Sequence, residues 1–98
     1  MQSREQEYKK LLLSIIEKKL PHCKVYLFGS RARGGFLPGA DFDLAIDAGN
    51  RLDMGIIYSI QDMIEESILP VFVDIVDVHN VSKEFLDEIK RDWIVWKS

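Results

Sequence analysis

Apolar residues recur along the chain at two different spacings, and these separate the predicted helices from the predicted strands. Three segments carry apolar side chains at intervals of three and four residues, which is the spacing of one helix face. They are the segment before Pro21, residues 52–68, and the segment that follows Ser82. Proline ends a helix because it has no backbone N–H to donate, and serine is a favoured N-cap. The pattern therefore predicts three amphipathic helices.

Three shorter segments have the character of strands. Residues 25–28 form an apolar run that ends at Gly29. From Asp41 to Asp47 apolar and polar residues alternate, which is typical of a strand with one face on the core. Residues 71–78, VFVDIVDV, are nearly all apolar and branched, so we expect a central strand covered on both faces. The order of elements predicts a small α/β sandwich with helices packed mainly on one face of the sheet.

Length and composition predict one folded domain of ordinary globular type. The chain has 98 residues, of which 47% are hydrophobic and 30% charged. Its one cysteine, Cys23, cannot form an internal disulfide, and no signal peptide or membrane-spanning apolar run is present. These features predict a cytoplasmic protein with no membrane partner. The net charge of -3 provides no basic field for a nucleic-acid backbone, so long nucleic acid is not an expected partner.

Three aspartates form a candidate metal site. Asp41 and Asp43 share one face of their predicted strand, because residues two apart on a strand point the same way. Two carboxylates held this close repel each other unless a cation lies between them, and oxygen ligands of this kind suit Mg²⁺. Asp74 interrupts an apolar strand, where an ionised carboxylate needs an ion pair or a metal. If the two strands are neighbours, the three carboxylates converge on the face away from the core.

A glycine turn forms a candidate phosphate site. Gly29 and Ser30 follow a predicted strand, where glycine lets backbone N–H groups approach a phosphate and the serine hydroxyl adds a donor. Arg31 and Arg33 lie in the same turn, and a guanidinium donates paired hydrogen bonds to phosphate. Each signal alone has an ordinary explanation as a turn, a solvated acidic edge or a surface charge. Their combination predicts a bound nucleoside triphosphate.

Four other titratable residues are expected to take no part in the chemistry. Asp47 and Asp77 lie near the ends of predicted strands and are expected to be solvated or to cap a turn. His22 and His79 lie in predicted loops, without the spacing to a second histidine or a cysteine that a zinc site requires.

The glycine turn and the acidic pair together resemble a known family. Gly29-Ser30, ten residues, and then Asp41-Phe42-Asp43 match the G-S-x10-D-x-D signature of the DNA polymerase beta superfamily of nucleotidyltransferases. The GSRARG run that starts at Gly29 and the later VDIVD segment are similar to those of minimal nucleotidyltransferase (MNT) domain proteins, the small partners of HEPN-domain proteins. The chain departs from many relatives at Ala40, where they have serine. The resemblance covers nearly the whole chain and implies a polymerase-beta-like fold with a mixed sheet of three to four strands, in one domain of residues 1–98.

The resemblance also implies a role for each candidate residue. Asp41 and Asp43 would bind metal ions, Asp74 would complete the catalytic triad, and Gly29 and Ser30 would hold the triphosphate. Two Mg²⁺ ions and ATP are the implied cofactor and substrate, and the implied reaction is AMP transfer to a hydroxyl. In HEPN/MNT toxin-antitoxin pairs the acceptor is a tyrosine of the HEPN toxin. The resemblance therefore predicts an antitoxin that modifies its partner.

Two other functions remain open. The first is a non-catalytic nucleotide-binding module that neutralises or scaffolds its partner by binding alone. The second is nucleotidyl transfer to a small molecule or to RNA, which is disfavoured because the chain has little room for a substrate domain and carries an acidic balance.

The end of the chain is unusually apolar. Trp93 is expected to end the buried stripe of the last helix, but the run Trp93–Trp96 is too dense in apolar side chains for one helix face. Part of this run either contacts a partner or a second copy of the chain, or else both tryptophans cover the small core.

Overall fold

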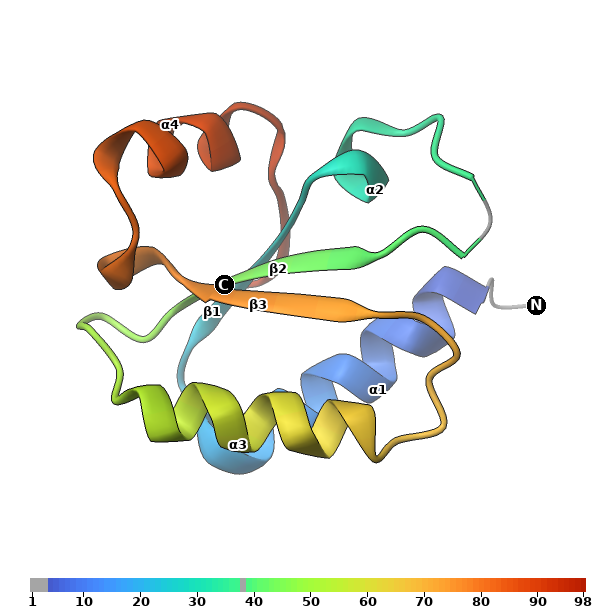
Figure 1. The fold of residues 1–98 in the computed structure, drawn as a ribbon, viewed down its shortest axis with the longest axis horizontal. Coiled ribbons are helices and arrows are strands. Elements are labelled where there is room, and N and C mark those ends of the chain that lie inside the picture. The colour runs from blue at the N-terminus through green and yellow to red at the C-terminus, as the bar shows by residue number, and fades with distance from the viewer. Residues whose placement is uncertain (1–3, 38) are drawn as a thin grey trace.

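The computed structural model describes residues 4–37 and 39–98. The elements in chain order are α1 (Arg4–Lys19), β1 (Lys24–Phe28), α2 (Ser30–Arg33), β2 (Phe42–Asp47), α3 (Met54–Glu65), β3 (Val73–Asp77), the 3-10 helix η1 (Val78–Asn80), α4 (Lys83–Asp92) and β4 (Ile94–Lys97). The strands form one mixed sheet in the order β3-β2-β1-β4 (Figure 1). β1 pairs antiparallel with β2 and with β4, whereas β2 and β3 are parallel. The predicted α/β class and mixed sheet are confirmed.

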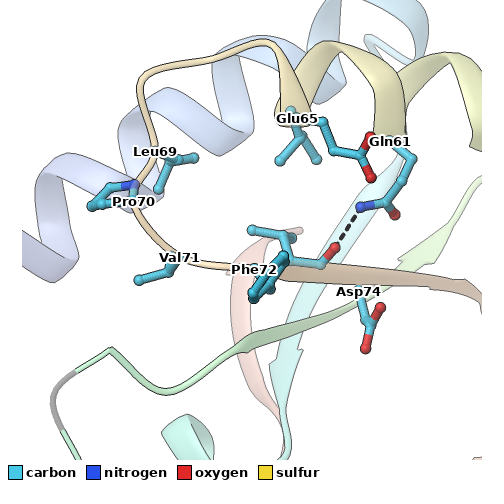
Figure 2. A pocket seen from close by; sticks show the side chains of 9 residues that line it. Gln61, Glu65, Leu69, Pro70, Val71, Phe72 and Asp74 are labelled. Atoms are coloured by element: carbon cyan, nitrogen blue, oxygen red, sulfur yellow. Dashed lines mark hydrogen bonds between the residues drawn. The ribbon is translucent and has the colours of Figure 1, made fainter.

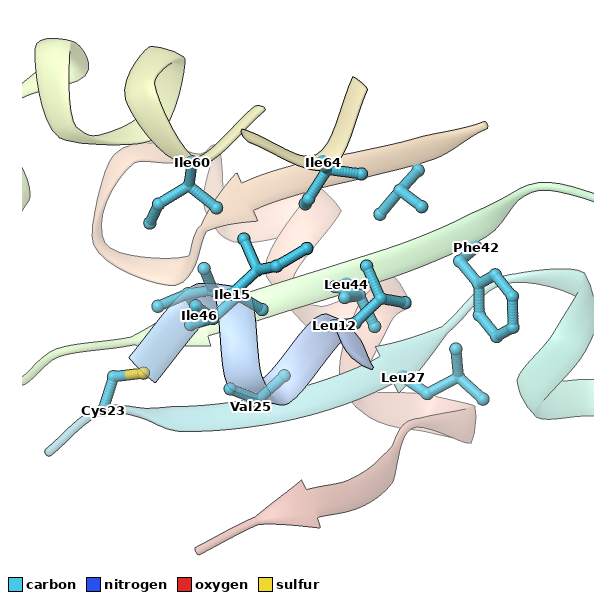
Figure 3. Close-up of a cluster of buried hydrophobic side chains, with 12 residues drawn as sticks. Leu12, Ile15, Cys23, Val25, Leu27, Phe42, Leu44, Ile46, Ile60 and Ile64 are labelled. Atoms are coloured by element: carbon cyan, nitrogen blue, oxygen red, sulfur yellow. The ribbon is translucent and has the colours of Figure 1, made fainter. Parts of the chain in front are cut away.

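Helices cover both faces of this sheet, but the two longest lie on the same face. α1 and α3 pack side by side on one face, and the short α2 and α4 lie on the other (Figure 1). The main core lies under α1 and α3, where their apolar stripes meet the inward side chains of the strands (Figure 3). Its fully buried members include Leu12, Ile16, Val25, Phe42, Leu44, Ile46 and Ile60. A second, smaller cluster around Ala45, Val78 and Ile89 lies under α4.

The expectation that residues 71–78 form a central strand is wrong, because β3 is an edge strand that pairs with β2 alone among the described strands. Its branched residues are still explained by contact on both faces of the sheet. Val73 belongs to the main core, whereas Val76 packs against the smaller cluster under α4. Asp74 is exposed, so its charge does not carry the burial cost that the sequence suggested.

The last strand, β4, was not anticipated. α4 ends at Asp92, and Trp93 stacks flat on Tyr26 with 3.7 Å between the ring centroids. Trp96 meets Phe42 edge-on at 5.8 Å. Both tryptophans therefore cover the core, as one of the two interpretations held, while Ile94 and Val95 are about half exposed, at 46% and 53%. A contact of these two residues with a partner or a second copy stays a prediction.

Local hydrogen bonds explain where the two later helices begin. The Ser82 hydroxyl accepts a hydrogen bond from the backbone N–H of Phe85, which confirms it as the N-cap of α4. Asp53 caps α3 in the same way by accepting from the N–H of Gly55 at 2.7 Å. No helix within the described residues has both the length and the apolar character needed to cross a membrane.

Candidate functional site

The three predicted aspartates lie together at one end of the β2–β3 pair. Asp43 and Asp74 are direct partners in the parallel register, and Asp41 precedes Asp43 by two residues. Partial burial raises the pKa of Asp43 above its usual value, and the nearby carboxylates of Asp74 and Asp41 raise it further. Arg33 partly offsets this effect by lowering the same pKa. The carboxylates are therefore close enough to repel one another, as the strand pattern predicted.

This arrangement is not a preformed metal cage. Among residues 4–37 and 39–98, no group of three or more His, Cys, Asp or Glu side chains is positioned to hold a metal ion. Asp41 and Asp74 are exposed and only Asp43 is half-buried, so two of the three side chains can change rotamer without disturbing the core. The donors are all carboxylate oxygens, which fit a hard cation such as Mg²⁺ better than a soft one.

Gly29 lies directly against the central carboxylate. Its φ of 77° is a conformation that favours glycine, and a Cβ at this position would overlap Oδ2 of Asp43. The chain then enters α2, in which the N–H groups of Ala32 and Arg33 both donate to the carbonyl of Gly29. α2 begins at Ser30, directly after Gly29, so its first residue adjoins the position of the Asp43 carboxylate. The predicted cradle of Gly29 and Ser30 is therefore next to the predicted metal ligands.

Arg31 is buried, which the sequence did not reveal. Its Nε donates to the carbonyl of Ala40 at 2.8 Å, and its guanidinium lies over the rings of Phe42 and Phe36, at 4.0 and 4.7 Å from their centroids. Glu5 lies 3.9 Å from its Nη1. These partners occupy the group predicted to bind phosphate, and they tie the loop that ends at Ala40 to α1 and α2. The geometry therefore supports a positioning role, since Ala40 precedes Asp41.

Arg33 remains the better candidate for phosphate. Its side chain is exposed, and its charge lowers the pKa of Asp43, which places it near the carboxylates. It also lines a small hollow of about 130 Å³ between α2 and α4 that includes Gly29 and Phe85. A triphosphate held by α2 would lie within reach of this guanidinium.

Three of the four other titratable residues, Asp47, Asp77 and His79, have structural partners. Asp77 is buried rather than solvated, and it accepts hydrogen bonds from the N–H groups of Leu52 at 2.7 Å and His79 at 2.9 Å. Asp47 accepts from the N–H of Gly49 at 2.8 Å and contacts Nε2 of His79 at 2.7 Å. Partial burial alone would raise the pKa of Asp47, but these partners lower it on balance. The expected capping role is thus confirmed for both aspartates.

A groove beside Asp74 was not found by the sequence analysis. It has a volume of about 620 Å³ and lies between the end of α3 and the segment that leads into β3 (Figure 2). We call it the α3–β3 groove. Its lining residues are Gln61, Ile64, Glu65, Leu69, Pro70, Val71, Phe72, Val73 and Asp74. The apolar pattern does not indicate this groove, because it predicts that residues 71 and 72 belong to the strand, whereas β3 begins at Val73.

Comparison with known proteins decides the family. The model of the family described as "Polymerase beta, Nucleotidyltransferase" matches residues 10–97. The chain belongs to the polymerase beta nucleotidyltransferase family. It is also 31% identical over 85 residues to "Probable protein adenylyltransferase MntA" of Haemophilus influenzae. The aligned region covers 87% of this chain and 75% of that protein. The resemblance based on the motif is therefore confirmed, and the chain is a nucleotidyltransferase.

Solved structures of similar fold come from toxin-antitoxin complexes. One is a toxin-antitoxin with AMP-PNP, at TM-score 0.77 and 22% identity, covering 90% of this chain and 71% of that one. Another is a tri-AMPylated HEPN toxin in complex with an MNT antitoxin from Shewanella oneidensis, at TM-score 0.73 and 22% identity, covering 93% and 70%. At this level of identity the likeness shows the fold, and it confirms the predicted polymerase-beta-like architecture.

Proposed function

We propose that this nucleotidyltransferase transfers AMP from ATP to a tyrosine hydroxyl of a HEPN-type toxin and so acts as its antitoxin. The observation that carries the proposal is the pairing of Asp43 with Asp74 across parallel strands, with Asp41 beside them and Gly29 packed against Asp43. The relatives support the choice of reaction and partner. The similar Haemophilus influenzae protein is named a protein adenylyltransferase, and the Shewanella oneidensis complex contains an AMPylated HEPN toxin.

Asp41 and Asp43 are the residues that would hold Mg²⁺, with Asp74 completing the set. Burial raises the pKa of Asp43, and the neighbouring carboxylates of Asp74 and Asp41 raise it further; a divalent cation would relieve this repulsion. Bound Mg²⁺, for which we expect two ions, would neutralise charge on the triphosphate and on the leaving pyrophosphate.

The other residues of the site would orient the reactants. The backbone at Gly29 and the hydroxyl of Ser30 would bind the triphosphate, and Arg33 would add a charged donor. Asp74 is exposed at the edge strand, where a protein hydroxyl can reach it and give up its proton. The tyrosine oxygen then forms a bond to the α-phosphorus, and the bond from that phosphorus to pyrophosphate breaks.

The proposal is tested by following the label from ATP. The chain is incubated with Mg²⁺, the HEPN-type protein encoded beside it, and ATP labelled at the α- or at the γ-phosphate. We expect label on the partner from the α-position only, and none with the double variant Asp41→Asn, Asp43→Asn. If the intact chain binds the partner and transfers no label, the proposed function is wrong.

A second candidate is a nucleotide-binding module that neutralises its partner by binding alone. It is favoured by the carboxylates, which within the described residues are not arranged at ligand spacing. We expect the pair to act in the cytoplasm. The same double variant therefore separates the two functions when it is tested in cells that express the toxin. Protection equal to that of the wild type would assign neutralisation to binding, whereas loss of protection with partner binding retained would assign it to catalysis.

A further inference from the structure

The α3–β3 groove reaches the proposed catalytic carboxylate. Figure 2 shows Gln61 and Glu65 on one side of β3 and Asp74 on the other. The lining therefore continues around the outer edge of β3, where no further strand of residues 4–37 and 39–98 pairs. A segment lying in the groove and crossing this edge would arrive at Asp74.

We propose that the α3–β3 groove binds the acceptor-bearing segment of the protein substrate, an apolar stretch with basic residues beside its tyrosine. This inference rests on the proposed function and specifies the surface that presents the tyrosine. A groove ending at Asp74 would bring the hydroxyl to the group that accepts its proton, and such positioning is a large part of the catalytic effect when two macromolecules react.

The groove is rich in exposed apolar surface. Phe72, which lines it, is 82% exposed, and Ile68, in the same connection between α3 and β3, is 92% exposed. Large apolar side chains this exposed on one connection are typical of a surface that a partner covers. Leu69, Pro70 and Val71 extend the apolar lining along the same connection.

The charge of the lining favours a basic occupant over the nucleotide. The charged residues that the structure describes in its lining, Glu65 and Asp74, are both acidic. A nearby hollow of about 400 Å³ is lined instead by Arg4 and Arg31 as well as Glu5. A triphosphate would be repelled from the α3–β3 groove, whereas lysine or arginine beside the tyrosine would be attracted to it.

The first test measures AMP transfer as a function of partner concentration. Phe72→Ser and Glu65→Lys alter the groove, and Tyr58→Ser and Glu66→Lys are matched controls, because Tyr58 and Glu66 are exposed on or beside α3 outside the lining. We expect both groove variants to raise KM for the partner by about tenfold or more with kcat within about twofold, and both controls to keep the wild-type KM. KM values equal to those of the controls, or a loss confined to kcat, would overturn the inference while leaving the proposed function intact. A wild-type chain that transfers no AMP would instead overturn the proposed function, and the inference with it.

The second test locates the occupant directly. A photoreactive phenylalanine analogue is placed at position 72, or at position 58 as the control, and the complex with the HEPN-type partner is irradiated. We expect the crosslink from position 72 to fall within the partner segment that contains the AMP-accepting tyrosine, as mapped by mass spectrometry. Crosslinks to another part of the partner, or equal crosslinking of the acceptor segment from position 58, would contradict the inference.

Discussion

Gly29 and Asp43 are packed so closely that a methyl group at position 29 would overlap Oδ2 of Asp43. The backbone of Gly29 also has a φ of 77°, which is unfavourable for other residues. Glycine at this position therefore satisfies two separate requirements, a turn conformation and space for a carboxylate. The second requirement links the glycine turn to the acidic pair of the motif through direct contact.

Replacement of Gly29 by alanine should abolish AMP transfer, because the new methyl group displaces the carboxylate of Asp43. The strained φ alone should cost about 1 to 3 kcal/mol of folding free energy. Gly49→Ala is the matched control, since Gly49 has a φ of 88° and open space around the position of a Cβ. We expect urea unfolding to show that both variants are less stable than the wild type. Gly49→Ala should lose activity only in proportion to its unfolded fraction, whereas Gly29→Ala should lose more activity than its unfolded fraction explains. Equal activity in the two variants would show that the contact with Asp43 does not matter.

Arg31→Lys should destabilise the protein and weaken its use of Mg²⁺. Lysine keeps the charge but cannot reproduce both the bond to Ala40 and the stacking on Phe42, a loss of about 1 to 3 kcal/mol. Arg31 holds the carbonyl of Ala40, the residue before Asp41, so its loss should leave Asp41 less well positioned to bind Mg²⁺. A higher Mg²⁺ concentration should therefore be needed for half-maximal transfer. Arg33→Lys is the comparison, and it should keep wild-type stability and raise KM for ATP.

The opposite result for Arg31 would support the prediction from the sequence that this residue contacts phosphate. That contact would be supported if Arg31→Lys kept the wild-type unfolding midpoint and Mg²⁺ dependence and raised only KM for ATP.

Asp43→Asn should stabilise the free protein near pH 7 while abolishing transfer. Burial and the neighbouring carboxylates raise the pKa of Asp43, so the folded protein holds the ionised form unfavourably. This cost develops as the pH rises above about 3.8 and through the raised pKa, and it is fully present near neutrality. We therefore expect a higher melting temperature for the variant in the presence of EDTA. Added Mg²⁺ should raise the melting temperature of the wild type alone, and a variant that melts below the wild type in EDTA would contradict this electrostatic account.

The sequence predicted the elements whose side chains repeat with a clear period. The alternation from Asp41 to Asp47 identified β2 and the face that carries Asp43, because one side of that strand lies on the core. The apolar run at residues 71–78 predicts a central strand, and this prediction is wrong for a physical reason. The burial of Val73 on one face and the partial burial of Val76 on the other are reflected in the composition, whereas the open hydrogen-bonding edge of β3 is not.

Other features depend on contacts between distant parts of the chain. β4 is only four residues long, and its pairing with β1 involves residues about 70 positions away, so no local period marks it. The motif identified Gly29 and Asp43, but it could not distinguish Arg31 from Arg33. That distinction depends on the contact of the Arg31 guanidinium with the Ala40 carbonyl, nine residues later in the chain. The α3–β3 groove depends in the same way on the path of residues 66–72.

Asp47→Asn should lower stability at neutral pH and make the acid unfolding of the protein less steep. The N–H of Gly49 and the ring of His79 outweigh partial burial and lower the pKa of Asp47. A lowered pKa in the folded state means that the ionised carboxylate stabilises the fold above about pH 3.8, and that this contribution disappears as the pH falls through the lower folded-state pKa. Urea unfolding at a series of pH values should therefore show a gap between wild type and variant at pH 6 that closes below pH 3.8. A gap that stays constant down to pH 2 would mean that Asp47 stabilises the end of β2 by packing and not by its charge.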